Sequence, residues 1–431
     1  MKFMKKEDGG LKDFCILWVT QSFSQLGSSI TAFALTLWLY EKTGSALSTA
    51  ALTIFTYLPY VVMSVFAGAL SDRFDKKKTM LYCDLFAALC TIAVLVLYKK
   101  DLLAGWHLYL LNVLSGMMNT IQQPASEVAY TSLTPKEYYQ KTSGLQYLSK
   151  SLISVGSPLI ASMLYGFAGL DGAIAADLFS FAIAFTVLLL FIRLPDLSRK
   201  TEKKESIFEL VEEGFTFLKD NPLILNMILF MAGVNLIASA FDAVLPALVI
   251  PSPKGGNAVL GIVTSCSGIA MVVGSMIATV MPKPKDRVKV IYLTMLFALG
   301  SENFFLAFSR EPAVWCIGQV LGWILVPVMS ASENVIMKSV VPVELLGRIY
   351  ACRNSLQFFT IPIGLFLGGF FTDNIAEPFM VANASNSFLT ALFGQGKGSG
   401  AALMMFVLGL AGIAVCVVFG KKMNQYHYSD N

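Results

Sequence analysis

Long hydrophobic runs alternate with short polar segments along nearly the whole chain. Each run approaches the roughly 20 residues that a helix needs to cross the hydrocarbon core of a bilayer. Inside lipid only helices and closed barrels satisfy their own backbone, and the sequence lacks the ~10-residue alternating segments typical of a barrel. The pattern therefore predicts an all-α membrane protein.

The runs form two groups of six, separated by a polar stretch. The first six lie near residues 14–40, 46–70, 79–98, 104–130, 142–168 and 171–193. The second six lie near residues 223–250, 258–281, 289–309, 312–338, 346–372 and 400–420. We therefore expect twelve transmembrane helices in two pseudo-symmetric six-helix bundles, residues 1–193 and 222–431, joined by a cytoplasmic linker, residues 194–221.

The linker carries its own helix signal. Ser206 and Glu209 have the spacing of a capping box, and apolar residues follow at helical intervals. This pattern predicts a short amphipathic helix on the inner membrane surface. A solvated helix that only tethers the two bundles is the favoured alternative.

Composition and charge agree with this layout. Hydrophobic residues make up 55% of the chain and charged residues 14%, against about 25% charged residues in soluble domains. If both termini are cytoplasmic, all but six of the 32 Lys and Arg residues lie on the inner side, as the positive-inside rule requires. We expect a multi-pass protein of the plasma (inner) membrane in this orientation, and a monomer.

Several chemistries find no support in the sequence. The seven cysteines occur singly and only two histidines are present, so we expect neither a metal site nor another cofactor. No GxxxxGK[ST] loop for ATP is present, and we expect neither an enzyme nor a nucleic-acid-binding protein. A non-transporting membrane sensor is a less favoured alternative, because the termini are short.

An internal repeat relates the two groups of runs. Ala125-Ser126-Glu127 near the end of the fourth run corresponds to Ala331-Ser332-Glu333 near the end of the tenth, and each is followed by Ser-x-x-Pro-x-Glu. Two related halves predict a substrate site at their interface, near the middle of the membrane.

The loop after the second run carries a family motif. In "GALSDRFDKKK", Gly68, Asp72, Arg73 and Lys77 match the pattern Gly-x-x-x-Asp-Arg-x-Gly-Arg-Lys, with Asp75 at its glycine position. The chain therefore resembles the major facilitator superfamily. The motifs "YEKTGSA", residues 40–46, and "VPVELLGRIYA", residues 341–351, resemble its branch of macrolide-efflux-type exporters.

The resemblance implies a secondary transporter that exports hydrophobic or amphipathic small molecules by alternating access, with protons as the candidate coupling ion. A lipid, peptide or siderophore exporter, or a facilitator, is the alternative. Two departures from the family pattern weaken the case for proton antiport as the energy source and for export as the direction of transport. Asn112 replaces an arginine common in proton-coupled members, and "GSPLIAS", residues 156–162, keeps only part of an exporter motif.

The resemblance also implies a cytoplasmic latch formed by Gly68, Asp72, Arg73 and Lys77. The Asp72 carboxylate would meet the positive end of the eleventh helix, worth up to ~2 kcal/mol when partly buried. Arg73 would pair with an acidic group. The alternative is a loop that only anchors the topology, and we favour that role for Lys76, Lys77 and Lys78.

Polar residues recur at helical spacing within the first, fourth, seventh and tenth runs, which the resemblance places around the cavity. We expect the substrate to be bound by the residues Gln21, Gln25, Asn119, Gln123, Asn235 and Trp323. The alternative is hydrogen bonding between packed helices.

Ionisable side chains within spans cost at least ~2.5 kcal/mol on insertion scales and are functional candidates. We expect Asp242 to bind the coupling proton, followed as candidates by Asp177, Glu127 and Glu333. For Asp177 a helix cap or interhelical bond is the alternative, and for Asp84 we favour pairing near the interface. The outer segment 374–400 is expected to be a plain loop, with an interfacial helix as the alternative.

Overall fold

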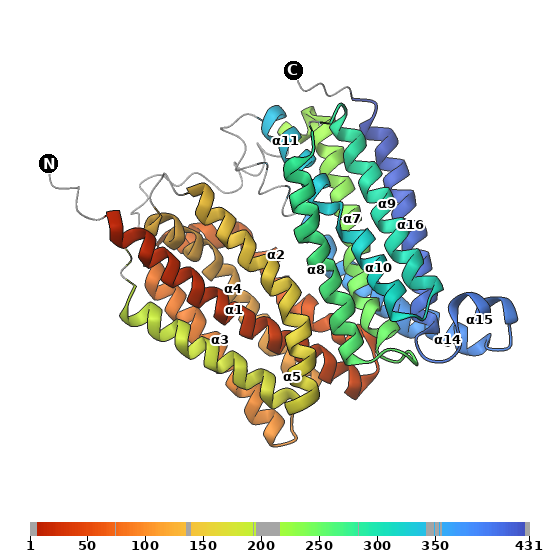
Figure 1. Ribbon diagram of the computed structural model, residues 1–431, viewed down its shortest axis with the longest axis horizontal. Helices are drawn as coiled ribbons and strands as arrows, with labels where there is room; N and C mark the ends of the chain where they lie inside the picture. The colour runs from red at the N-terminus through yellow and green to blue at the C-terminus, as the bar shows by residue number, and fades with distance from the viewer. Residues whose placement is uncertain are drawn as a thin grey trace. The chain divides into compact units, whose positions relative to one another are not determined.

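The computed structural model describes most of the chain (Figure 1). The described residues are 7–73, 75–134, 139–192, 194, 216–282, 284–341, 349, 353 and 356–426. Every regular element within these ranges is a helix. Contacts divide the chain into two compact units: unit 1 comprises Met1–Leu39 and Phe55–Lys204, and unit 2 comprises Tyr40–Ile54 and Glu205–Asn431.

The described residues of unit 1 form five long helices. They are α1 (Glu7–Thr43), α2 (Ala46–Arg73), α3 (Lys76–Lys99), α4 (Gly105–Leu133) and α5 (Tyr139–Leu190). The adjoining ends of α1 and α2, residues 40–54, belong to unit 2 by their contacts.

A kink divides α5 into two helical stretches. Gly169 has φ 62°, a left-handed conformation that glycine adopts without a steric penalty. The kink falls at the boundary that the sequence predicts between runs 142–168 and 171–193.

Glycines let the helices of unit 1 approach closely. A Cβ on Gly27 of α1 would lie 2.9 Å from the Cα of Asp177 on α5, and one on Gly116 of α4 would lie 3.2 Å from the carbonyl carbon of Thr56 on α2. Such short separations exclude any larger side chain at these two crossings, and small residues serve this purpose in membrane helices.

Unit 2 contains the remaining helices. They are α7 (Pro222–Val249), α8 (Asn257–Val280), α9 (Arg287–Phe308), α10 (Pro312–Trp323), α11 (Val326–Val340), α13 (Thr360–Phe371), the π-helical turn η2 (Thr372–Ala376), α14 (Glu377–Ala382), α15 (Ser387–Phe393) and α16 (Ser399–Met423). Helix α7 is the most buried of these and packs against α13 and α16, while α9 packs against α16 and α10.

The predicted tenth span, 312–338, is two helices rather than one. Helix α10 ends at Trp323 and α11 begins at Val326, with Pro327 in its first turn. Proline lacks a backbone N–H and disfavours helical geometry in the preceding residue, so the break lies just before it.

The segment after α13 is also helical, which makes the plain-loop prediction for 374–400 wrong. The π-helical turn continues α13 directly into α14, and α15 follows after Asn386, whose side chain accepts hydrogen bonds from the N–H groups of Phe388 and Leu389.

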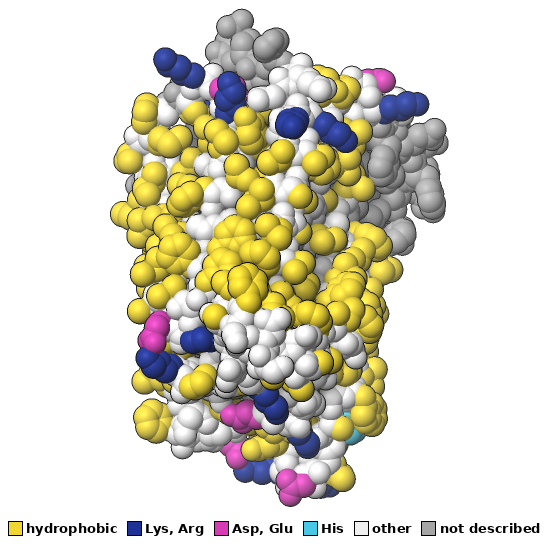
Figure 2. Space-filling model, turned by 90° about the vertical axis from the view of Figure 1, so that its right-hand side faces the viewer, with side chains coloured by type: hydrophobic (Ala, Val, Ile, Leu, Met, Phe, Trp, Pro, Cys, Tyr) yellow, Lys and Arg dark blue, Asp and Glu magenta, His cyan; other side chains and the backbone are white. Residues whose placement is uncertain are grey.

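The outer surface fits a bilayer. One face of unit 2 carries a broad band of hydrophobic side chains, with charged side chains gathered towards its two ends (Figure 2). Phe297 on α9 and Leu410 on α16 are among the exposed apolar residues. Eight helical segments of the described residues are long and apolar enough to cross a membrane. The chain is an integral membrane protein.

Candidate functional site

Helix α4 carries an uncovered polar stripe. Asn119, Gln123 and Glu127 are exposed and follow one another at intervals of four residues, which places them on one side of the helix. Thr120 is buried, and its hydroxyl donates to the carbonyl of Gly116, 2.7 Å away. Three predicted site residues therefore share a surface that the described helices leave open.

Helix α1 divides its polar residues between two environments. Gln25 is exposed, as expected for a residue that lines a cavity. Gln21 is partly buried, and its amide donates to Asp84 Oδ2 over 3.3 Å. Gln21 thus takes part in a contact between α1 and α3.

Asp84 joins three helices of unit 1. Besides the bond from Gln21, its Oδ1 accepts a 2.5 Å hydrogen bond from Gln122 Nε2 on α4. We expected this carboxyl to pair near the membrane interface, and two interior amides hold it instead. Glutamine amides donate well to carboxylates in a low-dielectric setting, which accounts for the preference.

Asp177 on α5 is buried and likewise held by two helices. Ser28 donates to Oδ1 over 2.9 Å and Thr91 donates to Oδ2 over 3.1 Å. Of the two roles that the sequence left open for Asp177, these bonds favour the interhelical one. Its candidacy as a proton carrier stays a prediction.

Helix α7 has uncovered positions on two sides. Pro222, Leu229 and Asp242 are exposed, and Asn235 between them is partly exposed. Asn235 and Asp242, seven residues apart, share one side of the helix, whereas Pro222 and Leu229, also seven apart, share another side. The residues that flank Asp242 are almost fully buried: Phe241 is 3% and Ala243 2% exposed. Asp242 is therefore an open carboxyl between buried neighbours.

A second carboxyl, that of Glu302, lies next to Asp242. Glu302 on α9 is 6% exposed, and Trp323 Nε1 donates to its Oε1 over 3.0 Å. Gly322 makes room for it, since a Cβ there would lie 2.8 Å from the Cβ of Glu302. Glu302 also interacts electrostatically with Asp242. Trp323, predicted to bind substrate, thus meets a buried acid.

Glu333 on α11 is buried and faces a cation. Its Oε1 lies 3.7 Å from Arg353 Nη1, and both side chains are mostly enclosed. This ion pair gives Glu333 a structural partner, as the bonds from Ser28 and Thr91 do for Asp177.

The predicted cytoplasmic latch is described only in part. For Gly68, Asp72 and Arg73 the structure describes only the backbone, as part of α2, and the linker residues Ser206 and Glu209 lie outside the described residues. Lys77 Nζ donates to the carbonyls of Leu189 and Ile192 at the end of α5, over 2.9 and 2.8 Å. A cation is stabilised at the negative end of a helix, so Lys77 fixes α3 to α5 within unit 1.

Asp75, the departure from the family motif, has a local explanation. It is the N-cap of α3, and its Oδ1 accepts a hydrogen bond from the N–H of Lys78 over 2.8 Å. Aspartate is among the preferred N-cap residues, whereas glycine lacks the side-chain acceptor.

Sequence reasoning did not single out Glu302 or Asp84 as site residues. Both belong to the set of charged residues within spans, which was the available signal. Their partners Trp323, Gln122 and Gln21 come from other helices, and no spacing along the chain reveals such pairs. Among the described residues, no group of three or more His, Cys, Asp or Glu side chains could hold a metal ion.

Comparisons with known proteins match nearly the whole chain. The profile of a family described as "Transmembrane secretion effector" matches residues 11–396. The chain is 25% identical over 383 residues to "Macrolide efflux protein A" of Streptococcus pyogenes, covering 86% of this chain and 92% of that protein. It is 28% identical over 294 residues to "Enterobactin exporter EntS" of Shigella dysenteriae, covering 65% and 66%.

A solved structure shares the fold. The inward-facing, unoccupied form of a bacterial homolog to the human lysosomal transporter Spinster superimposes with a TM-score of 0.71 at 14% identity, covering 98% of this chain and 99% of that chain.

Proposed function

The chain belongs to the family described as transmembrane secretion effectors, within the major facilitator superfamily, and we propose that it exports hydrophobic or amphipathic small molecules by alternating access. It is a membrane transporter of the macrolide-efflux branch and not an enzyme. In this proposal twelve spans form two six-helix bundles, residues 1–193 and 222–431. They are joined by a linker over residues 194–221, with both termini in the cytoplasm.

The uncovered polar sides of α4 and α7 carry this proposal. Asn119, Gln123 and Glu127 on α4, and Asp242 on α7, are exposed within helices that cross the membrane in the proposed layout. A charged side chain against lipid costs at least ~2.5 kcal/mol on insertion scales, whereas one in a water-filled cavity avoids most of this cost. Exposure in a spanning helix therefore favours a wet cavity on that side.

The surroundings suit an amphipathic substrate. Gln25, Asn119, Gln123 and Asn235 offer amides, and Trp323 offers an aromatic face, so hydrogen bonds orient a ligand whose bulk contacts apolar surface. Macrolides, which the name of the streptococcal relative specifies, have this character. We place the proton on Asp242, whose exposed carboxyl can exchange protons with water in the cavity.

The match to the enterobactin exporter favours a second candidate substrate. A catecholate siderophore is more polar than a macrolide, and its phenolic oxygens would accept hydrogen bonds from the same amides. Competition by enterobactin for transport of a macrolide separates the two candidates.

Uptake of radiolabelled erythromycin into inside-out vesicles tests the proposal. An acidic vesicle interior should drive accumulation above the level in vesicles without a gradient, since export in the cell corresponds to uptake here. Vesicles from cells without the protein are the control. Equal uptake in both kinds of vesicle for erythromycin, ethidium and enterobactin alike would contradict export of these substrate classes.

A further inference from the structure

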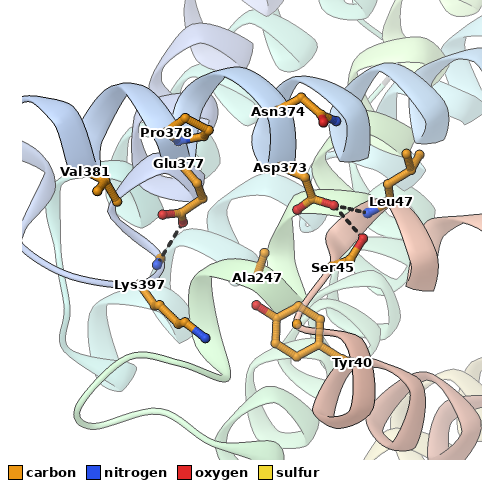
Figure 3. A pocket seen from close by; sticks show the side chains of 12 residues that line it. Tyr40, Ser45, Leu47, Ala247, Asp373, Asn374, Glu377, Pro378, Val381 and Lys397 are labelled. Carbon is orange, nitrogen blue, oxygen red and sulfur yellow. Dashed lines mark hydrogen bonds between the residues drawn. The ribbon is translucent and has the colours of Figure 1, made fainter.

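Two carboxylates lie together directly after α13. Asp373 lies in η2 and Glu377 begins α14, and both line a pocket of about 550 Å³ in unit 2 (Figure 3). Tyr40, Ser45 and Lys397 line the same pocket. The two acids point in different directions and have different partners, and these partners decide their roles.

Asp373 binds the first turn of α2. Its Oδ2 accepts hydrogen bonds from Ser45 Oγ over 2.6 Å and from the N–H of Leu47 over 2.9 Å. Its Oδ1 accepts one from the N–H of Ala46 over 3.1 Å. Backbone N–H groups in the first turn of a helix have no partner within that helix, so Asp373 satisfies two of them.

This cap is additional to a local one. Ser45 precedes α2, and its Oγ already accepts a 3.0 Å hydrogen bond from the N–H of Ser48. The first turn of α2 contains no acidic residue, so the negative charge that its dipole favours comes from Asp373, 326 residues beyond Leu47 in the chain. A helix that serine caps locally does not need a remote carboxylate merely to begin.

Glu377 holds α14, which directly follows the turn that carries Asp373, against the start of α16. Its Oε1 accepts hydrogen bonds from the N–H of Gly398 over 2.8 Å and of Ala401 over 3.3 Å, at the start of α16. The Arg310 guanidinium donates to the carbonyls of Phe393 and Gly398. Burial lowers the pKa of Arg310, and the charge of Glu377 opposes that shift. These bonds attach α14 and α15 firmly to α16.

The segment Tyr40–Ile54 also packs against α13 and α7. A Cβ on Gly369 would lie 2.6 Å from the Cα of Leu47, so α13 and α2 touch backbone to backbone. Ala50 is 3% exposed and packs against Ala243 and Leu365. Both α1 and α2 continue from this segment of unit 2 into residues that belong to unit 1.

We infer that Asp373 is a positioning residue of the transport cycle. It holds Tyr40–Ile54 against the rest of unit 2 until it releases Ser45, Ala46 and Leu47. The inference rests on the proposed function, because alternating access requires packed elements to exchange one arrangement for another. The bonds suit a reversible contact: they are short and charge-assisted, and the neighbouring pocket lets water solvate the groups as they part.

Cysteine labelling tests this role directly. The seven native cysteines are replaced by alanine, and Ala50→Cys then reports whether the segment has left unit 2. In purified protein, Asp373→Ala should raise the rate of maleimide labelling at position 50 by about 2- to 30-fold, the range expected for loss of a helix cap. Asp373→Asn keeps one acceptor oxygen and should give an intermediate rate.

Two controls separate release of the segment from general loosening. Asp286 caps α9 within its own helix by accepting from the N–H of Lys289, and Asp286→Ala removes a cap of the same kind without touching Tyr40–Ile54. Ala402→Cys reports on α16, where Ala402 is fully buried. Labelling at 50 should respond to Asp373→Ala only, and labelling at 402 to neither variant.

Either of two results would overturn the inference: unchanged labelling at position 50 in Asp373→Ala, or an equal rise at 50 and 402. Labelling requires no substrate, so its outcome does not depend on the erythromycin assay. A selective rise at 50 without accumulation of any probe would refute the proposed export while leaving the attachment by Asp373 established.

Discussion

The interior carboxyls of the two units differ in how they are held. In unit 1, Asp84 and Asp177 each accept two side-chain hydrogen bonds from other helices. In unit 2, Glu302 accepts one such bond, from Trp323, and Asp242 has no hydrogen-bond donor among the described residues. The two acids of unit 1 are thus fixed between helices, whereas Asp242 of unit 2 is left accessible.

We propose that this difference separates structural from functional acids. Interhelical hydrogen bonds within membranes contribute on average about 0.6 kcal/mol and at most about 1.7 kcal/mol each, so two bonds on one carboxyl make a useful tether. A carboxyl that is tethered in this way must break its bonds before it can serve a ligand. Asp242 has no such bond to break among the described residues, and we therefore propose that it serves transport while Asp84 and Asp177 serve stability.

The largest expected effect is on proton-driven transport. Asp242→Asn should lower gradient-driven erythromycin uptake at least about tenfold, equivalent to about 1.4 kcal/mol, because the amide cannot take up and release a proton. Asp177→Asn should leave uptake within about threefold, since the amide oxygen still accepts one hydrogen bond. Uptake into inside-out vesicles at equal protein content measures both, and the opposite ranking would reverse the assignment of the two acids.

Stability should show the converse ranking. Asp177→Ala leaves the hydroxyls of Ser28 and Thr91 without their acceptor and should cost about 1–3 kcal/mol of unfolding free energy. Asp242→Ala should change it by less than about 0.5 kcal/mol, as is usual for an exposed position. Denaturant unfolding in detergent, followed by tryptophan fluorescence, measures the two. Equal losses would mean that Asp242 has a structural role as well.

Gly27 tests whether Asp177 depends on the close approach of α1 and α5. Gly27→Ala places a methyl group 2.9 Å from the Cα of Asp177 and should destabilise unit 1 by about 1–3 kcal/mol through overpacking. Gly166→Ala in α5 is the matched control, because a Cβ there meets nothing within 4 Å. If both substitutions are equally mild, the helices can separate without loss, and the bonds to Asp177 hold them only weakly.

The sequence predicted features that depend on one helix at a time. The spacing of Asn119, Gln123 and Glu127 defines a stripe whatever the neighbours are, and the structure shows that stripe exposed. The break at Gly169 likewise follows from the end of one apolar run and the start of the next. Periodicity and run length are local properties, so the family and the helical class could be inferred from them together with the loop motif.

Features that depend on two helices could not be predicted. Nothing along the chain pairs Trp323 with Glu302, Gln122 with Asp84, or Asp373 with the start of α2. The helical segment after α13 was missed for a related reason: Glu377 accepts N–H groups of α16, and this tertiary contact orders residues whose local composition is typical of a loop.

The smallest expected effect concerns Trp323, and it can sharpen the contrast within unit 2. Trp323→Phe removes the single hydrogen bond to Glu302 and should cost at most about 1.7 kcal/mol in stability. Trp315→Phe is the matched control, because the fully buried Trp315 donates over 2.9 Å to the carbonyl of Ser309, away from Asp242. Without its donor, a Glu302 carboxylate would interact more strongly with Asp242. If the pair of Glu302 and Trp323 influences Asp242 in this way, the pH dependence of erythromycin uptake should change in Trp323→Phe and not in Trp315→Phe. The same pH dependence in both variants would show that Glu302 belongs with the structural acids, and that Asp242 acts without it.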